Sequence, residues 1–221
     1  MVKIYSILKV LLPNWLYVYL QNYKRLLTLP HDIRTIVKSL KKDDVCLDFG
    51  ANVGIYSQLF AKYDSKVYSF EPDPIPYEQL KEKSIKLKNI YPIMKAVGTS
   101  NSKGKLYLDE NYLLDKIFYS EHNSLVKEKD NVGDKFIEVE IVDIAEWLND
   151  FEKIKFVKID VEGFEVELIN YLIDSTAIKK IEYIFVETHE KRIQNLDKQI
   201  LELKNKIKHL GIENKFFWNW P

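Results

Sequence analysis

The chain has 221 residues, of which 46% are hydrophobic and 30% charged, proportions typical of a folded cytoplasmic protein with one domain or at most two. Its 33 acidic residues balance 33 basic ones, and arginine occurs only at positions 25, 34 and 192, so the composition argues against a nucleic-acid-binding protein. The single cysteine, Cys46, excludes a disulfide framework and a cysteine-based zinc site.

The first 42 residues are predicted to form a helical segment, interrupted at Pro13 and Pro30, ahead of a main domain over residues 43–221. The uncharged run over residues 10–23 is shorter than the roughly 20 residues that cross a bilayer. Leucine, tryptophan and tyrosine beside lysines would suit a helix lying on a membrane surface. We favour the other interpretation, a helix packed on the domain, and keep membrane contact as the alternative.

Strands and helices alternate in the next part of the chain. Apolar runs predict buried strands over residues 45–49, 66–70 and 91–97. Helical segments are expected between them, over residues 55–63 and 76–87. Strands that alternate with helices form parallel sheets, so we expect an α/β fold with a central, mostly parallel sheet flanked by helices.

The second half of the chain is less regular. Residues 105–109 and 136–142 alternate as exposed strands do, and residues 110–135 between them show little periodicity, which is typical of a functional loop. Two more apolar strands are predicted over residues 154–159 and 181–186, with a helix over 165–175 between them.

A last helix is predicted over residues 190–210, followed by a final strand. The helix carries an apolar stripe at alternating spacings of three and four: Ile193, Leu196, Ile200, Leu203, Ile207 and Leu210. We favour packing of this stripe on the sheet over a homodimer seam. The strand is expected at the closing aromatic residues, Phe216, Phe217, Trp218 and Trp220.

Acidic residues stand where four of the predicted strands end. These residues are Asp48, Glu71, Asp160 and Glu187, and His189 follows two residues after the last. Ligands of open α/β sheets bind at the carboxyl ends of the strands, and an unpaired buried carboxylate costs several kcal/mol. The row of acids therefore predicts a binding site at this edge of the sheet.

The turn over residues 48–54 narrows the ligand class. Gly50 and Gly54 allow a tight turn and close approach to a ligand, but Asn52 replaces the second glycine of the dinucleotide fingerprint. Glu71 follows Asp48 at about the 20-residue spacing of acids that hold ribose hydroxyls. The pattern predicts a nucleoside-bearing ligand, and it favours S-adenosylmethionine over NAD, which leaves an NAD-dependent oxidoreductase as the weaker alternative.

Lys158 lies inside an apolar strand and shares a face with Phe156 and Asp160. A buried lysine needs a carboxylate partner, and Asp48, Glu165 and Glu187 are the expected ones. A structural ion pair and a catalytic role remain equally open for it.

At these residues the sequence resembles the FkbM family of S-adenosylmethionine-dependent methyltransferases. The matching motifs occur in the family's order: DFGANVG at 48–54, SFEPDP at 69–74, AVG at 96–98, NSL at 123–125, VD at 142–143, FVKIDVEGFE at 156–165 and VETH at 186–189. The resemblance covers about residues 40–190. It implies a Rossmann-like, class I methyltransferase fold and the transfer of methyl groups to hydroxyls. The implied acceptors are sugars in glycans, glycolipids or surface polysaccharides, with polyketides as the alternative.

The resemblance also assigns residues to S-adenosylmethionine. The methionine part would be held by Asp48, Gly50, Ala51, Asn52 and Gly54. Glu71 would hold the ribose, Ala96 and Val97 would border the adenine, and Asp160 would lie near the ammonium group and the reacting centre. We count Tyr56, Ser57 and Pro72 with the same cofactor site. The chain departs from the family pattern after the last helix, where one strand-like run makes the terminal antiparallel hairpin incomplete.

A sugar hydroxyl is a weak nucleophile, so methyl transfer calls for a base or a metal ion. The candidate bases are His189, Asp160 and Glu162, and Lys158 is a further catalytic candidate. Asp160, Glu187 and His189 would form a Mg²⁺ or Mn²⁺ site, although an acid cluster without metal is favoured. Glu187 is also counted with the acceptor site.

The acceptor is expected to meet the loop over residues 110–135. Its His122, Asn123 and Ser124, with Tyr112 and Tyr119, suit sugar recognition, and an ordinary exposed loop is equally compatible with the sequence. A methyltransferase-like scaffold without activity is the non-enzymatic alternative.

Overall fold

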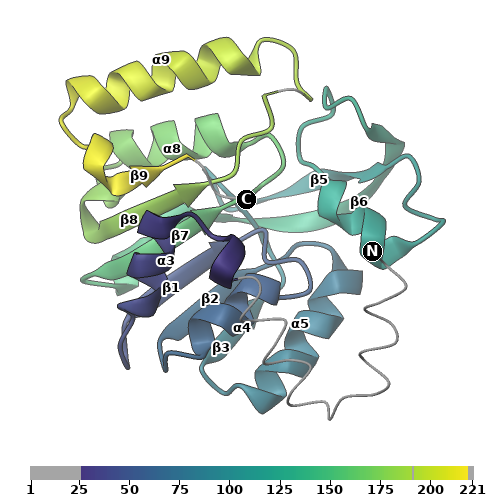
Figure 1. Ribbon diagram of the computed structural model, residues 1–221. Helices are drawn as coiled ribbons and strands as arrows, with labels where there is room; N and C mark the ends of the chain where they lie inside the picture. The colour runs from purple at the N-terminus through teal and green to yellow at the C-terminus, as the bar shows by residue number, and fades with distance from the viewer. Residues whose placement is uncertain (1–25, 191, 219–221) are drawn as a thin grey trace.

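The computed structural model describes residues 26–190 and 192–218, and Figure 1 shows a central sheet with helices on both faces. The strands of the main sheet are β1 (Val45–Phe49), β2 (Lys66–Phe70), β3 (Ile90–Ile93), β7 (Ile154–Ile159), β8 (Ile181–Val186) and β9 (Phe216–Phe217). A smaller sheet contains β4 (Ala96–Gly98), β5 (Ser102–Asp109) and β6 (Val132–Asp143). The α-helices are α3 (His31–Lys38), α4 (Ile55–Ala61), α5 (Pro74–Lys86), α6 (Lys116–Tyr119), α7 (Ile144–Trp147), α8 (Glu165–Asp174) and α9 (Leu196–His209). Short 3₁₀ helices are η1 (Ser120–His122), η2 (Leu148–Asp150), η3 (Ala177–Lys180) and η4 (Glu213–Lys215).

The main sheet has the strand order β3-β2-β1-β7-β8-β9, and every neighbouring pair is parallel. The order reverses between β1 and β7, which is the point where open α/β sheets bind their ligands. The carboxyl ends of all these strands meet at one edge. The architecture confirms the predicted Rossmann-like α/β fold with a mostly parallel sheet.

Two apolar layers hold the main sheet between its helices. Cys46 and Phe156 point into the layer formed with α3, α4 and α5, whereas Leu47 and Val157 point into the layer formed with α8 and α9. Strands buried on both faces read as continuous apolar runs, which is why β1 and β7 were predictable from the sequence. Lys158 falls on the face of Phe156, as expected.

The strand predicted over residues 91–97 is wrong as a single element. β3 ends at Ile93, the backbone turns back through a Lys95 N–H bond to the Ile93 carbonyl, and β4 begins at Ala96 in the smaller sheet. β3 pairs with β2, and β4 pairs with β6. Neither glycine nor proline stands between Ile93 and Ala96, and Lys95 alone is too weak a signal to predict the break.

The C-terminal helix is shorter than predicted, because α9 begins at Leu196. Its Leu196, Ile200, Leu203 and Ile207 are buried in the core layer beside α8, and Leu210 is exposed. The stripe therefore packs on the domain. β9 pairs with β8 as a short parallel strand, Trp218 packs beside it against the same core, and Trp220 lies outside the described residues.

The described part of the N-terminal segment packs on the domain. Ile33 and Val37 of α3, with Leu26, Leu29 and Leu40, are buried in the layer that contains α4. The predicted membrane-surface or packed helix over residues 1–25 lies outside the described residues. Within the part of the chain that the structure describes, no helix combines the length and the apolar character needed to cross a bilayer.

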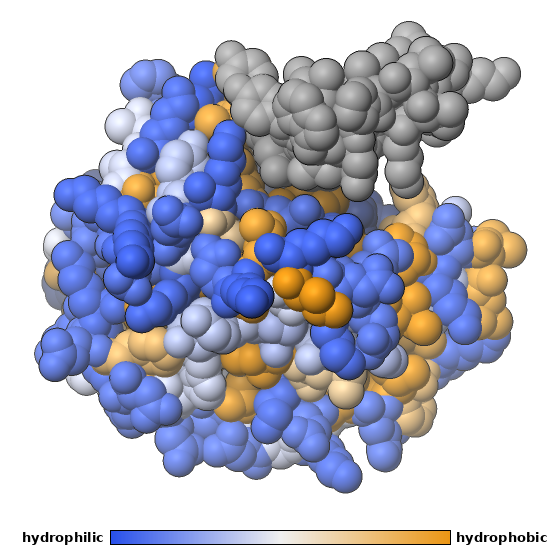
Figure 2. Space-filling view, turned by 90° about the horizontal axis from the view of Figure 1, so that it is seen from below, coloured by the Kyte–Doolittle hydropathy of each residue, from blue (hydrophilic) through white to orange (hydrophobic). Residues whose placement is uncertain are grey.

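The smaller sheet and the 110–131 segment cover the edge of the main sheet where the strand order reverses. β6 pairs antiparallel with β5 and parallel with β4. The segment contains α6 and η1, and Ser124 forms a bridge with Tyr107 of β5. Figure 1 places β5 and β6 beside the main sheet, and the face in Figure 2 is mainly hydrophilic with apolar side chains in small groups.

Candidate active site

A cavity of about 460 Å³ lies at the carboxyl edge of the main sheet, between the ends of β1, β2, β7 and β8 and the smaller sheet. This size lies within the range of small-molecule and cofactor sites. Phe70 of β2, Val97 of β4 and Leu106 of β5 give part of the cavity wall an apolar lining. Directly after β7 and β8 the wall carries carboxylates and His189, and we call this part the acidic end. The cavity therefore suits a ligand with both apolar and charged groups.

The structure brings most of the predicted site residues to this cavity. Those that line it are Gly50, Ala51, Asn52, Tyr56, Glu71, Pro72, Ala96, Val97, His122, Asn123, Lys158, Asp160, Glu162, Glu187 and His189. Four predicted residues are not part of its wall: Asp48, Gly54, Ser57 and Ser124. Asp48 and Ser57 instead lie in the layer behind it.

The turn after β1 is shaped by close backbone contacts. Gly50 has a φ of +73°, and a Cβ at this position would lie 1.8 Å from the Asp160 carbonyl oxygen. Only glycine therefore allows the turn to pack against the end of β7. Asn52 also has a positive φ, of 47°, which turns its backbone N–H toward the Glu71 carboxylate at 2.7 Å.

Glu71 is held at the end of β2 by the backbone. Its Oε2 accepts the Asn52 N–H, and its Oε1 accepts the Asp73 N–H at 2.8 Å. Burial raises the pKa of Glu71 to about 8, against the opposing effect of these two amides. Once Glu71 is ionised, each oxygen keeps a second lone pair, so the carboxylate can accept hydroxyl donors from a ligand in the cavity.

Lys158 links the layer behind the cavity to its wall. Its ammonium lies 3.3 Å from Asp48 and 3.1 Å from Asp160, and it donates to the Gly50 carbonyl at 3.0 Å. Asp48 was an expected partner, whereas the other two expected acids do not pair with it. Asp48 is fully buried and also accepts the Ser57 hydroxyl at 2.6 Å. The pair therefore fixes the turn after β1 against the end of β7.

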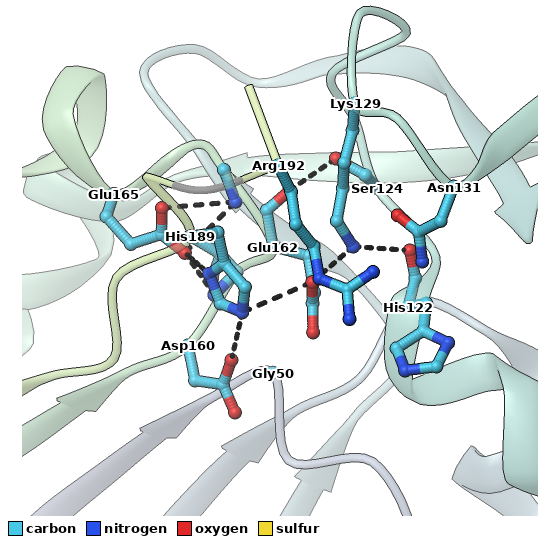
Figure 3. A network of polar contacts seen from close by, with 12 residues as sticks. Gly50, His122, Ser124, Lys129, Asn131, Asp160, Glu162, Glu165, His189 and Arg192 are labelled. Carbon is cyan, nitrogen blue, oxygen red and sulfur yellow. Dashed lines mark hydrogen bonds and ion pairs between the residues drawn. The ribbon is translucent and has the colours of Figure 1, made fainter. Parts of the chain in front are cut away.

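His189 lies among three carboxylates, as Figure 3 shows. Its Nδ1 is 3.0 Å from Glu165, and its Nε2 is 3.2 Å from Glu162 and 3.8 Å from Asp160. Burial lowers the pKa of His189, but the hydrogen bonds and charges of Glu162 and Glu165 outweigh burial and raise it to about 10. The ring is thus an imidazolium at neutral pH. Both of its nitrogens donate hydrogen bonds, so it has no free lone pair that could take a proton from the acceptor hydroxyl.

Glu162 stands in a strained turn after β7. Its φ is +55°, which is uncommon for a residue with a side chain, and the next residue, Gly163, has a φ of +112°. Glu165 stabilises this turn by accepting the Gly163 N–H at 3.0 Å and the Val161 N–H at 3.2 Å. The turn directs Glu162 toward the cavity, where both His189 and Lys129 contact it.

Lys129 and Arg192 were not predicted from the sequence. The Lys129 side chain is fully buried, pairs with Glu162 and donates to the His122 carbonyl at 2.8 Å. Arg192 lines the cavity, and its guanidinium lies 3.8 Å from the Asp130 carboxylate. In the sequence, Arg192 stands out because arginines are sparse, and Lys129 lies inside the irregular 110–135 segment. Neither observation indicates which carboxylate the side chain contacts. The other unpredicted lining residues are Ile55, Phe70, Lys95, Leu106, Ser120, Glu121, Leu125 and Val161.

The three residues of the 110–131 segment that were expected to meet the acceptor, beside Glu187, have different positions. His122 lines the cavity, with Nδ1 3.0 Å from Asp109. Asn123 is buried in the rim, where it donates to Asp73 at 2.8 Å and accepts the Asp109 N–H at 2.9 Å. Ser124 donates to the Glu162 carbonyl at 2.6 Å. Asn123 and Ser124 thus join the 110–131 segment to the main sheet.

A metal ion does not fit the acidic end well. Among the described residues the ligand-bearing group is Asp160, Glu162 and His189, and Glu187, which the sequence suggested as a ligand, is not a member. The Lys129 ammonium already contacts Glu162, and Lys158 contacts Asp160. These ammonium groups supply the positive charge that a divalent cation would bring. We therefore assign no step to a metal.

Fold and site together define a Rossmann-like α/β protein with a ligand cavity at the switch point of its sheet. Residues 48–211 match the family model described as the methyltransferase FkbM domain. The chain belongs to the FkbM methyltransferase family, as its motifs suggested.

The individual relatives have low sequence identity to this chain. The hexuronic acid methyltransferase AglP of Haloferax volcanii is 26% identical over 160 residues, which cover 71% of this chain and 61% of that protein. The methyltransferase sdnD of Sordaria araneosa is 27% identical over 182 residues, 70% of each chain. The crystal structure of the methyltransferase FkbM from Methylobacillus flagellatus KT is 14% identical with a TM-score of 0.44, over 78% of this chain and 38% of that one. The chain thus spans less than two thirds of the Haloferax relative.

Proposed function

We propose that the protein is an S-adenosylmethionine-dependent O-methyltransferase that acts on a hydroxyl of a sugar in a glycan, glycolipid or surface polysaccharide. The observation that carries the proposal is the cavity in which the Gly50 turn, the Glu71 carboxylate and the acidic end of the sheet meet. Membership of the FkbM family supports methyl transfer. The relative named as a hexuronic acid methyltransferase supports a sugar acceptor.

The residues present fit S-adenosylmethionine. Glu71 faces the cavity with free lone pairs for the two ribose hydroxyls. Ala96, Val97 and Leu106 supply a small apolar wall for an adenine ring. The absence of a side chain at Gly50 lets the turn after β1 pack against the Asp160 carbonyl, which brings the turn and Asp160 together in the cavity wall. Asp160 supplies a carboxylate for an ammonium group.

The cofactor supplies a methyl group bonded to a positively charged sulfur. The protein's own residues hold the acceptor oxygen in line with that carbon and accept the proton that the hydroxyl loses. The His189 imidazolium donates hydrogen bonds and holds Glu162 and Glu165 in place. The 110–131 segment closes one side of the cavity through His122 and Glu121 and limits the access of water.

Thermal unfolding in the presence of ligands tests the proposal. S-adenosylmethionine or S-adenosylhomocysteine at 100 times its Kd should stabilise the protein by about 2.7 kcal/mol, a rise of several degrees in Tm. NAD should cause no shift. Glu71→Ala should remove the shift, whereas Glu78→Ala, an exposed acid of α5, should keep it. Equal shifts in both variants, or a shift with NAD alone, would contradict the proposed cofactor.

Transfer of a labelled methyl group tests the acceptor. The probes are methyl glycosides of neutral hexoses and of hexuronic acids, incubated with the protein and S-adenosylmethionine. Methyl ethers at a sugar hydroxyl are the expected products. Cofactor binding without transfer to any sugar would instead favour a small natural product as acceptor, or an inactive scaffold.

A further inference from the structure

The proposed function requires a group that takes the proton of the acceptor hydroxyl, and this inference rests on that function. The three bases expected from the sequence are all engaged by cations or carboxylates. Asp160 lies 3.1 Å from the Lys158 ammonium, and Glu162 contacts Lys129 and His189. His189 is held as an imidazolium between Glu162 and Glu165. A general base needs a carboxyl oxygen that no cation neutralises, and Glu71 is assigned to the ribose, which leaves Glu121 and Glu187 among the acids of the cavity wall.

Glu187 meets this requirement. It follows β8 directly, and its backbone N–H donates to the Ile159 carbonyl at 3.0 Å, so it stands beside Asp160 at the switch-point edge. Its side chain is half-buried and lines the cavity. Among the described residues, no hydrogen bond or ion pair engages its carboxyl. Glu121 is the other unpaired acid of the wall, but it is exposed on η1 at the rim.

The surroundings of Glu187 favour a carboxyl that exchanges its proton near neutral pH. Burial and the neighbouring Asp160 charge raise the pKa of Glu187, whereas the charges of His189 and Lys158 lower it. The net result is a Glu187 pKa of about 7. Glu162 adds a smaller upward effect. On the other side of β8, the paired strand β9 consists of Phe216 and Phe217 and brings no charge. A general base is most effective when its pKa is close to the working pH.

We propose that Glu187 is the general base of the methyl transfer. The acceptor oxygen donates an electron pair to the methyl carbon while the bond from that carbon to sulfur breaks, with its electron pair going to sulfur. The hydroxyl proton moves to a Glu187 carboxylate oxygen. The sulfonium thereby becomes a neutral thioether, the hydroxyl becomes a methyl ether, and Glu187 becomes a neutral acid that releases its proton to water.

The assignment also defines the acceptor class. A base of this strength is needed for a neutral hydroxyl, whereas a carboxylate acceptor is already ionised at neutral pH. Glu187 therefore predicts ether formation at a sugar hydroxyl even on a sugar that carries a carboxylate. Methyl ester formation on the hexuronic acid probe, undiminished in Glu187→Gln, would overturn the assignment.

The kinetic test compares Glu187→Gln with Glu190→Gln, an exposed glutamate three residues further along that is not part of the cavity wall. Glu187→Gln should lower kcat at least 100-fold while the Tm shift with S-adenosylhomocysteine stays. The wild type and Glu190→Gln should show activity that rises with pH through about 7, because the base must be ionised. A kcat of Glu187→Gln within threefold of wild type, or loss of its S-adenosylhomocysteine shift, would overturn the proposal.

A titration without substrate gives a second readout. Carboxyl carbons of ¹³C-labelled glutamate, followed by NMR against pH, should include a resonance with a midpoint near pH 7, separate from that of Glu71 near pH 8, in the wild type and in Glu190→Gln. Glu187→Gln should lack it. A Glu187 midpoint near the ordinary value of about 4.3 would overturn the proposal even in a protein that methylates no probe. Failure of the proposed function would appear separately, as the absence of any shift with S-adenosylhomocysteine in the wild type.

Discussion

Lys158 is the residue on which the wall of the cavity depends most directly. It is fully buried and neutralises Asp48, which lies behind the cavity with no exposed surface. Burial raises the pKa of Asp48, the Asp160 charge adds a smaller upward effect, and Lys158 is the largest effect that opposes them. Removing the ammonium therefore leaves a buried carboxylate without its counter-ion.

We predict that Lys158→Met lowers the free energy of unfolding by about 3–5 kcal/mol, measured by urea denaturation. The double variant Lys158→Met/Asp48→Asn should recover part of the loss, because it removes the stranded charge. Lys153→Met removes an exposed ammonium from Glu182, which keeps its pair with Lys155, so stability should change by less than about 1 kcal/mol. Equal losses in Lys158→Met and Lys153→Met would contradict the buried-pair argument.

The strand-end acids were predictable because parallel strands bring their carboxyl ends to one edge, whatever lies between them in the sequence. The same rule holds for Glu187, whose position was predicted although its lack of a partner was not. The contact between Lys129 and Glu162 could not be predicted in this way. Lys129 reaches Glu162 from an irregular segment 33 residues away, and no periodic pattern indicates such a contact.

At the scale of elements, the turn between β1 and α4 depends on Gly50. A Cβ there would meet the backbone of Asp160, which cannot move without displacing the end of β7. We predict that Gly50→Ala destabilises the protein by roughly 2–4 kcal/mol, from steric overlap and a left-handed φ, and abolishes the Tm shift with S-adenosylhomocysteine.

Gly211→Ala is the matched control for this change. Gly211 has a similar φ of +67°, but no atom lies within 4 Å of its added Cβ. This variant should lower the free energy of unfolding by about 1–2 kcal/mol, the cost of the left-handed φ alone. It should keep the Tm shift with S-adenosylhomocysteine. A Gly50→Ala protein as stable as Gly211→Ala would show that the close contact with Asp160 after β7 does not destabilise the variant.

Elements with a strong apolar pattern matched the structure best. β1, β2, β7 and β8 have the predicted bounds because they are buried on both faces. The break between β3 and β4 was missed because it is determined by pairing partners, β2 for one and β6 for the other, and not by local sequence. Tertiary pairing decided that boundary.

At the scale of the whole molecule, two sheets share one cavity and are joined by polar side chains. Tyr112 and Asn123 donate to Asp73, and Ser124 donates to the Glu162 carbonyl. These contacts hold the 110–131 segment to the main sheet. The sequence showed an irregular segment there but could not show that buried hydrogen bonds order it.

We predict that this segment is ordered without ligand. The backbone N–H groups of Tyr107 and Ser124, which bond to each other's carbonyls, should exchange slowly with deuterium in the ligand-free protein. The exposed Glu128, whose N–H makes no hydrogen bond among the described residues, should exchange quickly. Equal, fast exchange at all three positions would show that the segment opens freely.

The placement of the cavity between two sheets has a consequence for the lifetime of the protein in the cell. A ligand that contacts both walls binds the closed molecule and not the opened one, so it lowers the population of opened chains as its concentration rises. Cellular proteases cleave the opened population. Under the proposed function, the abundance of the protein should therefore follow the supply of S-adenosylmethionine, with slow turnover when it is plentiful and faster degradation when it is scarce.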